Sequence, residues 1–169
     1  MDALDILRDL ASRPRATIAA LRGRLDPDIL AAHPGGHDNS VAWLLWHTGR
    51  EVDAQLAALT GDEQLWTERG HAERLGLGEV GDDIGYGHSP EQARSIAAED
   101  AAPLLDYADA ALEELQNYLE MVTVGDLEEI VDPDWEPPVT RAARLVSILD
   151  DAIQHLAQAS YVLGMPQRG

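Results

Sequence analysis

Apolar residues recur every three or four positions along almost the whole chain, which is the spacing of helices with one buried face. Ala, Leu, Glu, Gln and Arg are abundant, and runs of β-branched residues are absent. Four long stretches follow this pattern, so we expect an all-α protein built as a four-helix bundle. With 169 residues, residues 1–169 are expected to form a single domain.

Capping and helix-breaking residues predict where the first two helices lie. The first runs from about Leu4 to Leu25, with a kink or a break at Pro14. The second follows Asn39 or Ser40, either of which can cap it, and ends near Gly61.

A loop-rich insertion is expected between the second and third long helices, where glycines repeatedly interrupt residues 61–89. Loops of this length often carry function. The capping box Ser89-Pro90-Glu91-Gln92 opens a helical region that reaches about Val122, and Pro103 marks a kink or a second start within it.

The last helix follows an acidic connection over residues 123–139. Thr140 is placed to cap it, and the apolar pattern continues to Leu163. Gly164 and Pro166 are expected to end it.

The charge balance argues against several classes of partner. The chain has 31 acidic residues and 12 basic ones, all Arg, for a net charge of −19. Because phosphate affinity needs clustered positive charge, we expect neither nucleic acid nor anionic lipid as a partner. No apolar run approaches the roughly 18 residues that span a bilayer, and the acidic N-terminus lacks a signal-peptide pattern. We therefore expect a cytoplasmic protein with no membrane association.

The chain contains no Cys. Disulfides, zinc–thiolate sites and a protein thiol nucleophile are therefore excluded. Any thiol chemistry would need a thiol that arrives with a substrate.

Three residues on two helices have the spacing of a metal site. Asp151 and His155 are four apart on the last helix, on a face that Ile148 turns inward, and His47 is expected inside on the second helix. Two imidazoles and one carboxylate with an open position form the donor set of a catalytic zinc site. The metal would lower the pKa of a bound water or thiol. The alternative is a hydrogen-bonded polar cluster without a metal.

Other candidates are weaker. His88 lies in a predicted loop, where it either packs locally or lines the mouth of the pocket. Trp43, Trp46 and Trp135 are expected to fill the core. A di-iron site of the ferritin type needs Glu-x-x-His, and Ala152 occupies the position three before His155.

Four segments resemble motifs of the DinB-like superfamily, especially an actinobacterial branch related to mycothiol-dependent enzymes. Asn39-Ser40-Val41-Ala42-Trp43-Leu44-Leu45-Trp46-His47-Thr48-Gly49-Arg50, with Asp53 following, resembles the second-helix signature. Ile84-Gly85-Tyr86-Gly87-His88-Ser89 resembles the GYGH loop of that branch, and Trp135-Glu136-Pro137-Pro138-Val139-Thr140 resembles the lead-in to its last helix. Asp150–Tyr161 resembles its final-helix motif.

The resemblance implies a bundle that holds a divalent metal with His47, Asp151 and His155. Where this chain has Asp151, many relatives have His and the mycothiol-dependent isomerases have Glu. Asp is shorter, so the metal would lie closer to the last helix. Imidazole and carboxylate donors suit zinc or nickel.

The resemblance also implies a function. Characterised relatives use a low-molecular-weight thiol such as mycothiol or bacillithiol, so we expect a metal-dependent thiol S-transferase or isomerase that acts on a small electrophile. Arg50, Asp53 and His88 are candidates for substrate contact, although Arg50 and Asp53 could instead form a surface ion pair. The alternative is a non-catalytic binding or stress-response protein. Bundles of this kind often dimerise, and a homodimer is expected.

Overall fold

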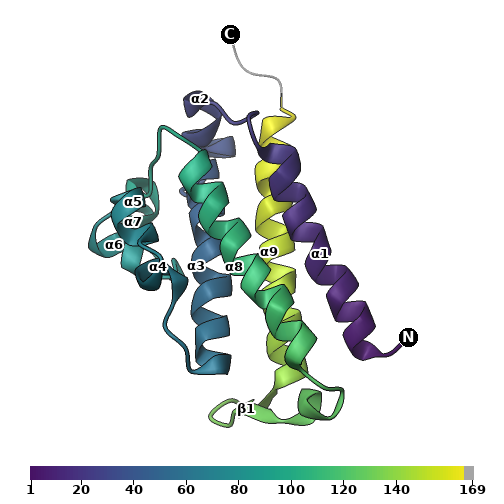
Figure 1. Ribbon diagram of the computed structural model, residues 1–169. Helices are drawn as coiled ribbons and strands as arrows, with labels where there is room; N and C mark the ends of the chain where they lie inside the picture. Colours follow the sequence, from purple (N-terminus) through teal and green to yellow (C-terminus); the bar gives the residue numbers. More distant parts are fainter. Residues whose placement is uncertain (166–169) are drawn as a thin grey trace.

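The computed structural model describes residues 1–165, and in this part of the chain four long helices lie side by side (Figure 1). They are α1 (Ala3–Leu21), α3 (Val41–Thr60), α8 (Ala102–Met121) and α9 (Arg141–Leu163). The most extensive contacts join α3 and α1 each to both α8 and α9. The predicted all-α bundle is therefore confirmed, and its centre is filled by fully buried side chains that include Leu45, Leu105, Leu112, Leu115, Leu149 and Leu156.

Side-chain caps start the helices largely where the sequence predicts. Ser40, and not Asn39, caps α3, because its Oγ accepts a hydrogen bond from the Trp43 amide at 3.1 Å. Thr140 Oγ1 accepts from the Ala143 amide at 3.2 Å and caps α9. α3 ends before Gly61, whose φ of 81° few other residues adopt. The predicted role of Pro166 in ending α9 lies outside the described residues.

Two proline expectations are resolved. Helix α1 continues through Pro14 without a break and ends at Leu21, earlier than the expected Leu25. Pro103, by contrast, marks a second start. The capping box at Ser89 begins the short helix α7 (Pro90–Ser95), and α8 then begins at Ala102 with Pro103 in its first turn, where no helical N–H is lost.

The connections contain short elements of their own. α2 (Pro27–Leu30) and η1 (Pro34–Gly36) join α1 to α3. The insertion of residues 61–89 folds into α4 (Leu65–Glu68), α5 (His71–Leu75) and α6 (Glu79–Asp82), which lie with α7 beside α3 (Figure 1).

A small hairpin closes the end of the bundle between α8 and α9, where the sequence predicts only an acidic connection. It consists of η2 (Gly125–Glu128) and the antiparallel strands β1 (Ile130–Asp132) and β2 (Val139–Thr140). Among the described helices, none combines the length and the apolar character needed to cross a membrane.

Helix α3 is enclosed on all sides in its first part. Every residue from 41 to 53 is buried, because α8 and α9 cover one side and the insertion covers the other. This segment has four ionisable residues, which are therefore interior groups that need partners: His47, Arg50, Glu51 and Asp53.

Candidate metal centre

Three donor side chains from α3 and α9 converge inside the bundle. Asp151 Oδ2 lies 3.3 Å from His47 Nε2 and 3.4 Å from His155 Nδ1. One possible ligand atom from each residue lies within 4.8 Å of the other two. The structure thus brings together the three residues that the sequence predicts as metal ligands.

His47 is held in one orientation by the insertion and by a neighbouring ring. Its Nδ1 contacts the carbonyl oxygen of Ile84, and its ring stacks on Trp43 with centroids 4.5 Å apart. When Nδ1–H donates to that carbonyl, Nε2 of the neutral ring carries the lone pair and faces Asp151. A backbone carbonyl that fixes the tautomer in this way is typical of metal-binding histidines.

Asp151 has a buried oxygen that lacks a partner. No hydrogen bond reaches its Oδ2 in the described structure, although Oδ2 is only 3.3 Å from His47 Nε2. Burial opposes ionisation of Asp151, but the neighbouring imidazoles of His47 and His155 outweigh it and lower the pKa of Asp151. Because a carboxylate oxygen and an imidazole lone pair repel, a proton or a metal cation must lie between them.

His155 connects the three-donor cluster to the surface. Its Nδ1 lies 2.9 Å from the backbone oxygen of Asp151, one turn earlier on α9. If Nδ1–H donates there, Nε2 is left with the lone pair. His155 also lines an open groove of about 600 Å³, so a small molecule can reach the cluster from this side.

The groove combines apolar walls with neutral polar groups, and its lining contains no acidic residue. The loop before α3 and the two helices supply Pro34, His37, Asn39, Leu44, His155, Ala157, Gln158, Tyr161 and Val162. This groove was not among the sites predicted from the sequence. The available signal was Gln158 and Tyr161, which follow His155 by about one and two turns.

Arg50 and Asp53 form an ion pair at 3.7 Å, but they are buried, so the pair does not lie at the surface as that alternative expected. The Arg50 guanidinium donates to the backbone oxygens of Asp82 and Asp83 at 2.8 and 2.9 Å. Asp53 accepts from the amides of Leu65 and Trp66, both at 2.8 Å. The two residues join the insertion to α3, and substrate contact by them stays a prediction.

His88 packs edge-on against Trp43, the tryptophan that supports His47. Its Nδ1 accepts from Trp43 Nε1 at 3.3 Å, and its ring stacks on Trp46 with centroids 5.5 Å apart. Asp83 lies 3.7 Å from Nε2. These contacts favour the interpretation of His88 as a loop-packing residue, and a direct substrate contact stays a prediction.

Glu51 is a buried acid that was not among the site residues predicted from the sequence. It follows His47 by four residues on α3, and only 5% of its surface is exposed. Burial is the main cause that raises its pKa well above the ordinary value; the charge of Asp151 adds to this, and Arg144 opposes it. The four-residue spacing from His47 was the signal that could have pointed to it.

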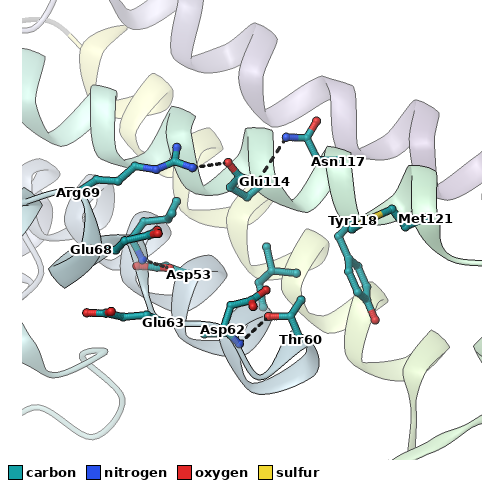
Figure 2. Close-up of a pocket in the computed structure, with 13 residues that line it drawn as sticks. Asp53, Thr60, Asp62, Glu63, Glu68, Arg69, Glu114, Asn117, Tyr118 and Met121 are labelled. Carbon is teal, nitrogen blue, oxygen red and sulfur yellow. Dashed lines mark hydrogen bonds and ion pairs between the residues drawn. The ribbon is translucent and has the colours of Figure 1, made fainter.

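A second hollow, of about 270 Å³, lies between α3, α4 and α8 and contains none of the three donors. Figure 2 shows its acidic rim, where Arg69 pairs with Glu114 at 2.6 Å and Asp62 contacts Thr60. These polar groups of the rim are therefore paired with one another.

Comparison with known proteins agrees with this architecture. The model of the DinB superfamily matches residues 10–159. A crystal structure of a conserved protein from Enterococcus faecalis has a TM-score of 0.86 and 30% sequence identity, over 96% of each chain. No curated protein matches the chain. The family match spans most of the bundle, including all three donor residues, and the chain therefore belongs to the DinB superfamily.

Proposed function

We propose that this protein is a divalent-metal-dependent thiol S-transferase or isomerase. Its co-substrate would be a low-molecular-weight thiol, and the thiol would react with a small electrophile. The observation that carries the proposal is the buried, unpartnered Oδ2 of Asp151 between two imidazoles. A divalent cation would satisfy all three donors at once, and zinc or nickel suits this set. The choice of a low-molecular-weight thiol as co-substrate rests on the resemblance to mycothiol-dependent enzymes.

In this proposal, the residues divide into those that hold the cation and those that hold the substrates. His47, Asp151 and His155 would bind the metal, which, when bound, lowers the pKa of a thiol. Trp43 and the Ile84 carbonyl keep Nε2 of His47 turned toward the cluster. The thiolate sulfur would attack an electrophilic carbon of the second substrate. It would either displace a leaving group such as chloride or add to a double bond whose other carbon takes up the proton that the thiol has lost.

The groove beside His155 is the place for the body of a substrate. Its neutral amides and phenol can hydrogen-bond a polar molecule, and its volume of about 600 Å³ is that of a small-molecule pocket. The thiol has to come from a bound molecule because the chain has no Cys.

The alternative is a DinB-type protein that binds a small molecule without turnover. The observation that favours it is the lining of the groove, which offers amides, a phenol and imidazoles but no carboxyl group. Such a surface can hold a ligand through hydrogen bonds without any bond being made or broken.

Metal analysis of protein purified without a metal-affinity tag tests the first step. We expect one zinc or nickel per chain in the wild type and in His33→Ala, whose imidazole lies outside the cluster. The variants His47→Ala, Asp151→Asn and His155→Ala should lose the metal while keeping the helical circular-dichroism spectrum. A well-folded, metal-free wild type that does not take up added zinc or nickel would rule out the proposal.

Turnover is tested by following loss of mycothiol or bacillithiol in the presence of a chloro-nitro aromatic. Metal-dependent thiol loss that disappears in His155→Ala supports the enzyme. Stoichiometric metal without thiol loss favours the binding protein. Light scattering of the same samples tests the expected homodimer.

A further inference from the structure

Glu51 offers an oxygen that nothing in the described structure satisfies. Its Oε1 accepts a hydrogen bond from Gln55 Nε2, but its buried Oε2 has no partner. A buried polar group without a partner is uncommon and costs stability. An unpaired carboxyl oxygen in the core of a bundle therefore indicates that a ligand or a positive charge binds next to it.

The charge of Arg144 acts on Glu51, but Arg144 does not pair with it directly. No salt bridge joins Glu51 to a basic group within the described residues, because the nearby Arg144 is engaged elsewhere. The guanidinium of Arg144 donates to Gln55 Oε1 at 2.8 Å and to Asp132 Oδ2 at 3.0 Å. Within the described residues, Glu51 thus receives a hydrogen bond from Gln55 but has no basic side chain paired with it.

The second orphaned oxygen of this region belongs to Asp151 on the facing helix. Glu51 Oε2 and Asp151 Oδ2 are both buried and both lack a hydrogen-bond partner. Glu51 follows His47 by one turn of α3, and α3 packs against α9, which carries Asp151; the charge of Asp151 accordingly disfavours ionisation of Glu51. Two uncompensated carboxylates in an apolar interior are costly, and a single divalent cation near both would stabilise both.

We propose that Glu51 is the second carboxylate of the metal centre. There it balances the charge of the cation and accepts a hydrogen bond from Gln55. Glu51 is not one of the three donors that lie within 4.8 Å of one another, so its role is that of a positioning residue beside them. This inference rests on the metal site of the proposed function. With Asp151, Glu51 gives two negative charges, which match one divalent ion.

Calorimetric titration of metal-stripped protein with Zn²⁺ tests the role of Glu51. Glu51→Gln keeps the size of the side chain and its contact with Gln55 but removes the charge. We expect Zn²⁺ affinity to fall about 10- to 100-fold, the usual effect of losing an outer partner of a metal site. The metal-free variant should unfold at the same or a higher temperature than the metal-free wild type, because it no longer buries an acid. Glu51→Asp, which retains the charge, should recover part of the affinity.

The matched control is Asp150→Asn, which removes one negative charge from an exposed position next to Asp151. It should leave Zn²⁺ affinity within about twofold of the wild type, since exposed charges are screened. If the wild type binds Zn²⁺ and Glu51→Gln binds it equally well, the role of Glu51 is overturned while the proposed function stands. If the wild type binds no Zn²⁺, the proposed function itself fails.

A measurement on the wild type decides the matter if Glu51→Gln does not fold. Infrared difference spectra of protein labelled with ¹³C at the glutamate side-chain carboxyl report only on glutamates, and the three proposed ligands include none. A Zn²⁺-induced change in a glutamate carboxyl band supports the assignment. A spectrum in which only unlabelled carboxyl bands change would refute it.

Discussion

The glycine that follows Ile84 allows the insertion to touch the candidate metal centre, and Gly85→Ala tests this contact. Gly85 has a φ of 90°, and an added Cβ would lie 2.9 Å from Trp43 Cζ2, 2.8 Å from Trp46 Cζ3 and 3.1 Å from His47 Nδ1. Real Cβ atoms avoid the first two distances, and neither indole can swing away, because Trp43 and Trp46 are buried. The loop must therefore move away from α3.

The expected cost has two parts. A non-glycine residue in a left-handed conformation costs about 1–2 kcal/mol, and overpacking a filled core adds about 1–3 kcal/mol. Gly85→Ala should therefore lower the free energy of unfolding by about 2–5 kcal/mol. When the loop moves, the Ile84 carbonyl also leaves His47 Nδ1, so Zn²⁺ affinity should fall about 10- to 100-fold.

Gly87→Ala is the matched control in the same loop. Gly87 has a φ of 74°, but an added Cβ would meet no atom within 4 Å. This variant should lose only the conformational part, about 1–2 kcal/mol, and should bind Zn²⁺ as the wild type does. Urea unfolding of the metal-free proteins and calorimetric Zn²⁺ titration measure the two effects. Equal Zn²⁺ affinities for the two variants would refute the idea that this loop orients His47.

Two further predictions concern the packing behind the site. Gly49→Ala should destabilise the protein by about 1–3 kcal/mol or more in urea unfolding, because its Cβ would lie 2.5 Å from Tyr107 Cδ1 between α3 and α8; unchanged stability would mean that this contact is not tight. Burial, followed by the charge of Arg74, lowers the pKa of His71. As the pH falls, His71 of the unfolded chain is therefore protonated at a higher pH than His71 of the folded protein. The contribution of neutral His71 to the free energy of unfolding is fully present above its unfolded pKa of about 6.5, and it is lost as the pH falls toward the lower pKa of the folded state. His71→Leu should therefore flatten the pH dependence of unfolding just below pH 6.5, and an unchanged slope would contradict this.

Local signals predicted most of the fold because they act over a few residues. The caps at Ser40, Ser89 and Thr140 need only a side chain three residues from an amide, and all three are formed. Of the kink or break predicted at Pro14, the break is wrong. Pro14 costs one helical hydrogen bond, but it is buried where α1 packs on α8 and α9, and this packing outweighs the loss.

The hairpin between α8 and α9 could not be predicted in the same way. Strands of three and two residues are too short to show an alternating pattern. Trp135 was expected in the core as a large aromatic residue, yet it is 65% exposed, because it lies in the turn between the two strands. Composition alone does not distinguish an indole in a turn from one in a helix.

The interior of α3 shows why only part of the site was predictable. His47, Asp151 and His155 were found because apolar neighbours on each helix indicated a buried face. Over residues 41–53, however, every face of α3 is buried, so periodicity no longer says which neighbour a polar side chain meets.

Arg50 and Asp53 turn toward the insertion and Glu51 turns toward α9, although all three are equally polar in the sequence. What separates them is the identity of the partners: backbone carbonyls and amides satisfy Arg50 and Asp53, whereas Oε2 of Glu51 is left without a partner. Backbone groups of a folded insertion leave no mark in the residue pattern. A buried polar residue on an enclosed helix can therefore be assigned to structure or to chemistry only by accounting for its hydrogen bonds. By that account Glu51 is the one of these three residues whose side chain is left with an unpartnered oxygen.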